Sequence, residues 1–353
     1  MKVDSITIRR PDDWHLHVRQ GDRMRSVVPF TARQFARAII MPNTKPFILT
    51  VDDAARYRDE ILAAVPSGVD FTPLMTLYLQ TTTSPKTIRA AKKSGFIHGI
   101  KMYPQGATTN SEGGVVRIQD VAEQLGVMEE VDMPLLVHGE VADPACDIFE
   151  REPAFYREAF EWVTGKFPKL RIVFEHITTE EAVHWISEAS RTLRIGATIT
   201  PQHLLVNRNY LLSGGIKPHA YCLPILKTEF DRKALVYAAT SGDPRFFLGT
   251  DSAPHPQHGE AGTAKETACG CAGAYNAHAA VERYLEVFDS VGKMDYLQDF
   301  ASHFGPKFYE LPLNNGKVTF IREAWQAPPS YTFGDSTVVP FMQEVPLQWR
   351  MAA

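Results

Sequence analysis

Eight short runs of apolar and β-branched residues recur along this chain, and segments with helical spacing separate most of them. This alternation is the pattern of βαβ units, in which parallel strands form a sheet that helices cover. The runs are residues 5–8 leading into Trp14, 38–41, 71–77, 99–102, 135–137, 172–174, 197–200 and 246–248. Eight parallel strands predict an α/β fold closed into a (β/α)8 barrel rather than an open sheet.

The segments between the runs carry apolar residues at the spacing of amphipathic helices. They are residues 51–65, 84–94, 118–131, 153–166, 179–190 and 229–240. Thr50 and Asp53 resemble a capping box at the start of the first segment. After about residue 310 the pattern loosens into Pro-rich stretches, which we interpret as a C-terminal extension packed on the barrel. Because barrels of this type commonly reach such a length, we expect residues 1–353 to form a single domain.

The formal net charge of −4 comes from acidic and basic residues that are interspersed along the chain. Such a chain has no broad positive field for nucleic-acid phosphates or anionic lipids, and no apolar run reaches membrane-spanning length. We therefore expect a small-molecule partner, with no nucleic acid and no membrane. The N-terminal segment lacks the apolar core of a secretion signal, which predicts a cytoplasmic protein.

The four cysteines are too few and too scattered to cross-link a chain of this length, so we expect reduced thiols. Cys269 and Cys271 flank Gly270 and could bind zinc, but no second thiol pair completes a four-ligand structural site. We interpret this segment as a tight turn.

Polar residues follow the predicted strands near the point where each strand ends. They are His15, His17, Asn43, Lys101, His138, His176 and Asp251. In a barrel the C-terminal strand ends meet at one rim, where enzymes of this fold carry their chemistry. A single histidine beside a strand is usually a hydrogen-bonded core residue, but the shared position of all seven residues predicts one site.

His15 and His17 are two residues apart, so on an extended backbone both imidazoles point to the same face and can bind one cation. His138 and His176 come from neighbouring strands and could hold a second cation. Asp251 would supply an anionic oxygen near the first cation. These residues leave open which ligand bridges the two cations.

Lys101 is unexpected at this rim, because two nearby cations would repel an ammonium group and lower its pKa. A neutral lysine amine can add carbon dioxide to give a carbamate, N6-carboxylysine, whose two oxygens can bridge two metals. The alternative is an ordinary lysine at a strand end that pairs with a carboxylate.

These residues resemble the two-metal form of the amidohydrolase superfamily. Within it, the chain is similar over nearly its whole length to the bacterial, shorter-chain dihydroorotase family. The segments that carry the resemblance are residues 11–19, 41–44, 136–140, 174–179, 200–204 and 249–255. The resemblance implies zinc-dependent, reversible hydrolysis of the cyclic amide of dihydroorotate to N-carbamoyl-aspartate in pyrimidine biosynthesis, by a homodimer.

The resemblance also implies a role for each residue at the rim. One zinc ion would be bound by His15, His17 and Asp251, the other by His138 and His176, with carboxylated Lys101 and a hydroxide bridging both. Two cations lower the pKa of bound water, which yields a nucleophile near neutral pH. Asp251 would act first as the general base and then as the general acid.

The substrate contacts that the resemblance implies are Arg19, Asn43, His138, Leu223, His255 and Ala272. Arg19, Asn43 and His255 match positions that bind the substrate carboxylate, and the fork of a guanidinium suits this role. The backbone at Leu223 and Ala272 would contact the ring. Thr108 and Thr109 match a loop that closes over the substrate.

Two alternatives remain beside this interpretation. A hydantoin or another cyclic imide would keep the metals but leave the Arg19 guanidinium unpaired. A catalytically silent barrel could serve as a scaffold, although the intact ligand set argues against it. The segment between His255 and Cys269 departs from the family pattern, because it is several residues longer and its Lys-Glu pair is Lys265-Glu266.

Overall fold

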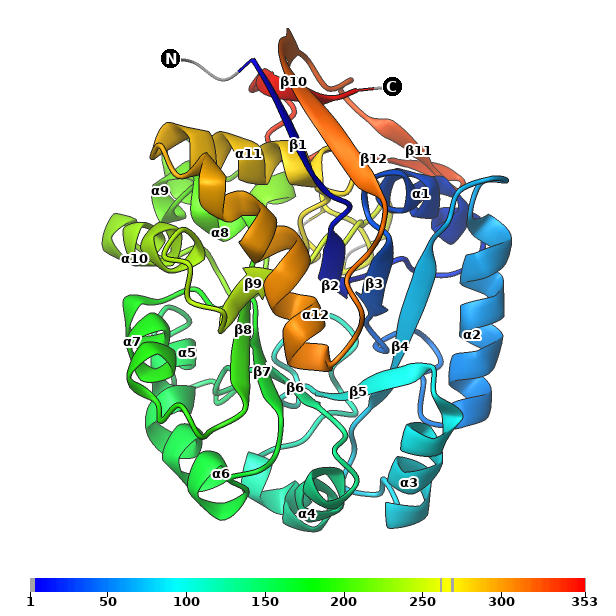
Figure 1. The fold of residues 1–353 in the computed structure, drawn as a ribbon, viewed down its shortest axis with the longest axis vertical. Helices are drawn as coiled ribbons and strands as arrows, with labels where there is room; N and C mark the ends of the chain where they lie inside the picture. Colours follow the sequence, from blue (N-terminus) through cyan, green and yellow to red (C-terminus); the bar gives the residue numbers. More distant parts are fainter. Residues whose placement is uncertain (1–3, 261, 268–269, 353) are drawn as a thin grey trace.

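The computed structural model describes residues 4–260, 262–267 and 270–352 and contains a barrel of eight parallel strands (Figure 1). Each strand pairs with the next one along the chain. The strands are β2 (Asp12–Leu16), β3 (Arg37–Ile40), β4 (Thr72–Tyr78), β5 (Ile97–Met102), β6 (Leu135–His138), β7 (Ile172–Glu175), β8 (Ile195–Ile199) and β9 (Phe246–Leu248). The predicted α/β barrel is confirmed. In the part of the chain that the structure describes, no helix is long and apolar enough to cross a bilayer.

The barrel closes between its last and first strands through hydrogen bonds just beyond the strand ends. The Asp251 N–H donates to the His15 carbonyl at 2.9 Å, and the His17 N–H donates to the Ser252 carbonyl at 3.1 Å. A parallel bridge between Leu16 and Ser252 belongs to the same seam. The segments that close the barrel are therefore the ones that carry three of the predicted metal ligands.

The first predicted strand does not belong to the barrel. Residues Ser5–Arg9 form β1, which pairs antiparallel with β10 (Lys317–Trp325), and β13 (Leu347–Met351) completes this separate sheet. The first barrel strand is instead Asp12–Leu16, which is buried throughout. The prediction was wrong because Ser5–Arg9 alternates as a partly exposed strand does. The polar residues of Asp12–Leu16 gave no sign that this segment is a buried strand.

The C-terminal extension is more regular than its loosened pattern indicates. In addition to β10 and β13 it contains a hairpin of β11 (Tyr331–Phe333) and β12 (Ser336–Val338). The three-stranded sheet brings both ends of the chain to one side of the barrel (Figure 1). The extension therefore packs on the barrel, as predicted, but as sheet rather than as loop.

The six predicted helical segments are all helical. They correspond to α2 (Val51–Ala64), α3 (Pro85–Ser94), η1 (Ile118–Val121) with α4 (Ala122–Glu130), α5 (Arg151–Phe155) with η2 (Tyr156–Phe160) and α6 (Glu161–Lys166), α7 (Glu180–Glu188), and α10 (Glu229–Ala239). The capping box of α2 is present, since Thr50 Oγ1 accepts the Asp53 N–H and the Asp53 carboxylate accepts the Thr50 N–H. Local caps and periodicity therefore suffice for these helices.

Other helices were not predicted. They are α1 (Gly21–Gln34), α8 (Pro201–Leu205), α9 (Arg208–Leu212), η3 (Pro218–Ala220), α11 (Ala280–Ser290), η4 (Met294–Tyr296), η5 (Asp299–His303) and α12 (Phe304–Tyr309). In α1, Pro29 lies inside the helix and Gln20 provides no side-chain cap, so the usual signals of a helix start and interior are missing.

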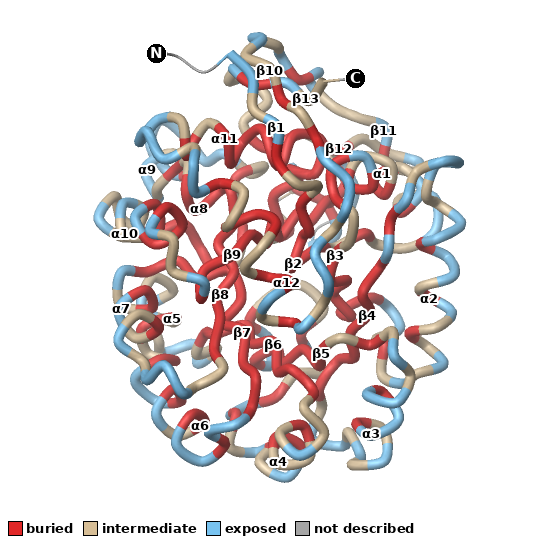
Figure 2. Tube along the Cα trace, viewed as in Figure 1, coloured by how far each residue is buried: buried red, intermediate tan, exposed pale blue. Residues whose placement is uncertain are grey.

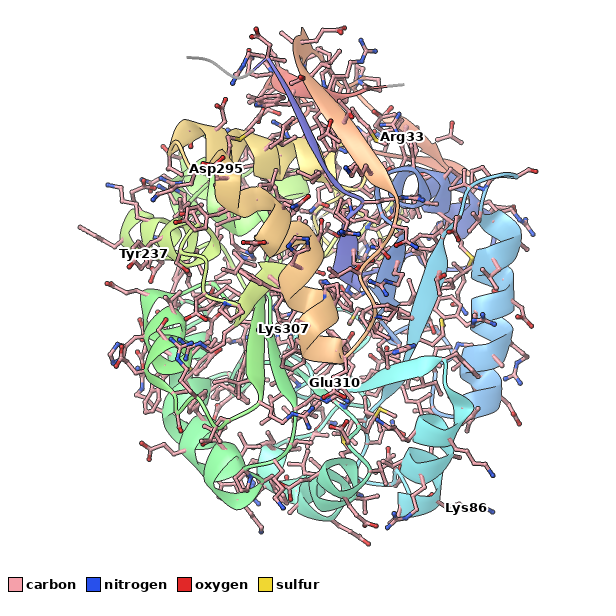
Figure 3. The ribbon with its side chains drawn as sticks, in the orientation of Figure 1. Arg33, Lys86, Tyr237, Asp295, Lys307 and Glu310 are labelled. Atoms are coloured by element: carbon pink, nitrogen blue, oxygen red, sulfur yellow. The ribbon has the colours of Figure 1, made fainter. Side chains whose placement is uncertain are left out.

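The N-terminal end of the barrel is closed by packing against α12. Buried residues line the barrel strands (Figure 2), and Trp14 stacks on Tyr309 with ring centroids 4.5 Å apart. Gly305 lies so close to Trp14 that a Cβ would overlap the indole ring. Glu310, at the end of α12 (Figure 3), pairs with Arg194 beside β8. We therefore expect small molecules to enter from the opposite end, where the strands end.

Glu282 of α11 makes the stability of this fold depend on pH. Its side chain is buried, Oε1 accepts the Met351 N–H at 3.3 Å, and burial raises the pKa of the carboxyl group from 4.5 to about 7. The folded chain therefore disfavours the ionised form. The free energy of unfolding should fall as pH rises from the unfolded pKa to the folded one, by about 3 kcal/mol for a shift of this size.

We expect Glu282→Gln to remove this dependence. The variant should match the wild type in stability at pH 4, where the carboxyl is protonated in both states, and should exceed it at pH 8. Denaturant unfolding at the two pH values measures the difference. A variant that is less stable than the wild type at pH 8 would contradict the assigned pKa.

Candidate metal centre

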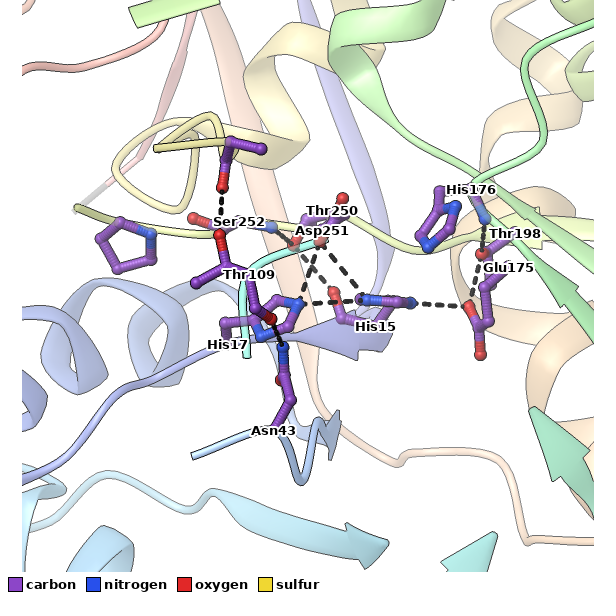
Figure 4. Close-up of polar contacts among 12 residues, drawn as sticks. His15, His17, Asn43, Thr109, Glu175, His176, Thr198, Thr250, Asp251 and Ser252 are labelled. Atoms are coloured by element: carbon purple, nitrogen blue, oxygen red, sulfur yellow. Dashed lines mark hydrogen bonds and ion pairs between the residues drawn. The ribbon is translucent and has the colours of Figure 1, made fainter. Parts of the chain in front are cut away.

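Three of the predicted ligands meet where the barrel closes (Figure 4). The Nε2 atoms of His15 and His17 are 3.4 Å apart, and each lies 3.2–3.3 Å from Asp251 Oδ1. All three ligand atoms lie within 4.8 Å of one another, as donors around a single cation do. His15 belongs to β2, His17 follows it, and Asp251 lies three residues beyond β9. The structure thus brings together residues more than 230 positions apart.

His176 joins this group to His138. The His176 ring centroid is 4.9 Å from that of His15 and 4.7 Å from that of His138. His138 ends β6, and His176 directly follows β7. Within the described residues, His176 Nδ1 is buried without a hydrogen-bond partner. A buried nitrogen with no protein partner, among other histidines, fits a metal ligand.

Lys101 of β5 is buried beside these ligands. Its side chain is 0% exposed, and its Nζ has no hydrogen-bond partner among the described residues. Its Nζ lies 5.1 Å from the centroid of the Tyr103 ring. Burial lowers the pKa of Lys101 to about 8, although Glu175 and Asp251 oppose the shift. Among the described residues, no carboxylate forms an ion pair with Lys101.

Two glutamates orient the histidines, and the sequence interpretation gave them no role. Glu175 Oε2 lies 2.9 Å from His15 Nδ1 and accepts the Thr198 hydroxyl at 2.6 Å. Glu140 Oε2 lies 2.6 Å from His138 Nε2. Each contact engages one ring nitrogen and leaves the other as the metal donor. The available signal was their position, since each lies within two residues of a predicted ligand.

Three site residues have left-handed backbone, which non-glycine residues rarely adopt. The φ angles are 61° at Arg19, 43° at His176 and 44° at Asp251. Each residue lies just after a barrel strand, where the chain must turn sharply into the rim. Such backbone is unfavourable and persists where the surrounding structure enforces it, as at functional sites. The conformation is therefore a feature that the tertiary structure imposes on these three residues.

For His17, His176 and Asp251 the pKa shifts favour the forms that bind a cation, whereas Glu175 and Asp251 raise the pKa of His15 against the effect of burial. Burial lowers the pKa of His17 to about 4 and that of His176 well below its ordinary value. Burial opposes ionisation of Asp251, but neighbouring His15 and His17 hold its pKa well below the usual range. Neutral imidazoles and an ionised carboxylate are the forms that bind metals.

The cavity above the ligands is small because the loop with Thr108 and Thr109 already lies over it. A space of about 20 Å³ is lined by the candidate metal ligands His15, His17, His138, His176 and Asp251 together with Arg19, Asn43, Thr108, Thr109, Leu223 and Ala272. Asn43 Nδ2 donates to the Thr109 carbonyl at 3.0 Å, and Thr109 Oγ1 donates to the Ala272 carbonyl at 3.5 Å. These bonds close the loop over the site.

Arg19 and His255 lie at the mouth of this space. Arg19 Nη2 is 2.9 Å from His255 Nε2, and Arg19 Nε donates to the Pro254 carbonyl at 2.7 Å. Both residues line an adjoining cavity of about 370 Å³. Among the described residues, no carboxylate forms an ion pair with Arg19. Its guanidinium is therefore held in place with binding capacity left for an anionic group.

All the predicted site residues line one of these two cavities, apart from Lys101, which is buried next to the ligands. The predicted turn at Cys269 lies partly outside the described residues. Its partner Cys271 is buried, and its Sγ is 3.0 Å from the Gly262 carbonyl oxygen.

Comparison with known proteins shows which family this chain belongs to. The profile of the amidohydrolase family matches residues 12–327. A protein from Nitrosomonas europaea named dihydroorotase is 54% identical over 352 residues and covers 99% of both chains. The crystal structure of a dihydroorotase from Campylobacter jejuni superposes with a TM-score of 0.89 at 33% identity, covering 100% of this chain and 99% of the other. A dihydroorotase from Saccharomyces cerevisiae, solved with 5-fluoroorotic acid, has a TM-score of 0.89 at 31% identity and covers 99% of each chain.

Proposed function

This chain belongs to the amidohydrolase family, and from that membership and the site described above we propose that it acts as a dihydroorotase. It is a metal-dependent hydrolase of a small cyclic amide. The reaction is the reversible hydrolysis of (S)-dihydroorotate to N-carbamoyl-L-aspartate, a step of pyrimidine biosynthesis. The observation that carries the proposal is the Arg19 guanidinium, which forms no ion pair with a carboxylate of the described residues and lies beside a cluster of candidate metal ligands.

We propose that the site holds two zinc ions. His15, His17 and Asp251 would bind one ion, and His138 and His176 the other. Lys101, as N6-carboxylysine, would bridge them. The support is that Lys101 Nζ and His176 Nδ1 are buried without protein partners among the described residues, so each is available to a further group. Zinc bound here would lower the pKa of water and polarise the amide carbonyl.

Asp251 moves the proton in this proposal. Its Oδ1 lies 3.2–3.3 Å from the Nε2 atoms of His15 and His17, so the carboxylate lies within the proposed metal site. As an ionised carboxylate it accepts the proton of the attacking water. It then returns that proton to the ring nitrogen as the C–N bond breaks. One residue therefore serves first as base and then as acid within the same turnover.

Arg19, Asn43 and His255 bind the substrate carboxylate in the proposal. Arg19 is already oriented by Pro254 and His255, so little side-chain entropy is lost when an anion binds. The backbone at Leu223 and Ala272, which lines the same cavity, contacts the ring. Thr108 and Thr109 close over the bound substrate and exclude water.

We also propose that the chain forms a homodimer in the cytoplasm, which rests on the resemblance to the shorter-chain family and on the few cysteines. Light scattering on the purified protein would measure the dimer. The function itself is tested by assaying zinc-loaded protein with dihydroorotate and with carbamoyl-aspartate. Protein that retains two metals but turns over neither compound would overturn the proposed reaction.

Replacing Arg19 with methionine separates dihydroorotate from a hydantoin-type substrate. We expect kcat/KM for dihydroorotate to fall about a hundredfold, mainly through KM, because a bidentate carboxylate contact is lost. Arg25→Met is the matched control, since Arg25 is exposed and pairs with Asp22. Steady-state kinetics measures both variants. Unchanged turnover in Arg19→Met would favour a substrate without a carboxylate.

A further inference from the structure

Lys265 lies in the long segment that follows His255, and its side chain is turned into the protein with 3% exposed. Its Nζ donates three hydrogen bonds of 2.8 Å, to the carbonyl oxygens of Tyr221, Cys271 and Gly273. Burial lowers the pKa of Lys265 to about 7. Three carbonyl acceptors favour the ammonium form, because a neutral amine has only two N–H donors.

The three carbonyls belong to two backbone segments that line the substrate cavity. Cys271 and Gly273 flank Ala272, and Tyr221 lies two residues before Leu223. Both Ala272 and Leu223 line the cavity. One ammonium group therefore links the two backbone segments that form one wall of the site.

Ala272 in turn contacts residues that close and complete the site. Its carbonyl accepts the Thr109 hydroxyl at 3.5 Å, and its backbone also forms a hydrogen bond with His255. His255 lies 2.9 Å from the Arg19 guanidinium. A shift of Ala272 would therefore displace the lid contact and the partner of Arg19 together.

The backbone around Ala272 is closely packed and is held by a limited set of hydrogen bonds, which includes the bond from the Ala253 N–H to the Ala274 carbonyl at 2.9 Å. A Cβ at Gly273 would lie 2.5 Å from the Ala253 carbonyl oxygen, and Gly273 has a φ of 148°. The Gly273 N–H donates to the Tyr221 carbonyl, and the Cys271 N–H donates to the Ala264 carbonyl. The Lys265 ammonium adds three bonds to this small set and is the charged group among them.

Glu266, the next residue, faces the opposite way. Its carboxylate contacts His219 at 2.8 Å and Gln257 at 2.9 Å and is about one third exposed. These two consecutive residues therefore contact different regions. Lys265 contacts the wall of the cavity, and Glu266 contacts residues at the outer surface. Glu266 is the natural control for any change at Lys265.

We propose that Lys265 is a positioning residue that fixes the backbone at Ala272 and Leu223 for contact with the substrate ring. The identity of that ring rests on the proposed function, but the contacts of Lys265 do not. Because Lys265 touches none of the metal-binding residues, its loss acts on substrate binding rather than on metal content or the chemical step.

The first experiment compares Lys265→Met with Glu266→Gln in the full-length, zinc-loaded protein. Methionine keeps the length and apolar stem of lysine but has no N–H donor. We expect KM to rise at least about tenfold while kcat changes less than about threefold and two metals per chain remain. Glu266→Gln should leave both constants within about twofold of the wild type. A Lys265→Met variant with wild-type KM, or one whose metal is lost, overturns the proposal.

The second experiment restores the donors chemically. Lys265→Ala leaves space for a small ammonium ion, so ethylammonium should lower its KM, whereas tetramethylammonium, which has the charge but no N–H, should not. Equal effects of the two ions contradict the proposal. If the methionine variant does not fold, Lys265→Leu, which likewise has no N–H donor, takes its place under the same criteria.

Hydrogen exchange separates failure of this inference from failure of the proposed function, because it needs no substrate. We expect amides of residues 270–274 to exchange at least about tenfold faster in Lys265→Met than in the wild type, with the barrel strands unchanged. Wild-type protein that does not hydrolyse dihydroorotate would refute the function alone. Unchanged exchange in the variant would refute the positioning role alone.

Discussion

Asp251→Asn is expected to lower kcat by at least about a thousandfold, because the amide can neither accept the proton of the attacking water nor return it to the ring nitrogen. Asparagine keeps the size of the side chain and one ligand oxygen. The backbone bond from the Asp251 N–H to the His15 carbonyl does not depend on the side chain, so the barrel should still close. The loss is therefore one of chemistry rather than of fold.

The measurement combines steady-state kinetics with metal analysis and thermal unfolding of the same preparation. Asp59→Asn is the matched control, since Asp59 is an exposed residue of α2, and it should retain wild-type kcat. An Asp251→Asn variant that keeps its metals and more than about a tenth of the wild-type kcat would show that another group transfers the proton.

Lys101→Ala is expected to remove the bridge and with it at least one metal ion, so that turnover falls by at least about a thousandfold. The lysine is buried on a barrel strand, and no other described residue offers its Nζ a hydrogen bond. Alanine leaves a cavity beside His138, His176 and the His15 group. A short carboxylate such as propionate should enter it, replace the two carbamate oxygens and restore part of the metal binding and turnover.

Metal content per chain and turnover, each with and without propionate, measure this prediction. Wild-type protein loaded with zinc in buffer freed of carbon dioxide should also be less active until bicarbonate is added. Lys92→Ala is the control, because Lys92 lies on the exposed face of α3. A Lys101→Ala variant with two metals and wild-type turnover would exclude the carbamate bridge.

Most of the barrel and the candidate rim residues could be predicted from local sequence patterns. Strand period, helical spacing and the capping box at Thr50 are local properties, so they can be interpreted within a window of a few residues. The ligands could be predicted because His15, His138, His176 and Asp251 lie at or just past strand ends, and a closed barrel brings such ends together. The local pattern gave a wrong prediction at Ser5–Arg9, because the alternation of apolar and polar residues in a strand does not specify which strand it pairs with.

The contacts that orient these residues depend on tertiary packing. Glu175 reaches His15 across 160 positions of the chain, and Lys265 joins the segments at Tyr221 and Cys271. Neither contact can be recognised from sequence periodicity, because each depends on how elements far apart in the chain pack. A buried charge also becomes favourable only when its partners surround it in the folded protein. The spacing of the ligands is therefore a property of the sequence, whereas their orientation and the wall of the substrate cavity are properties of the folded barrel.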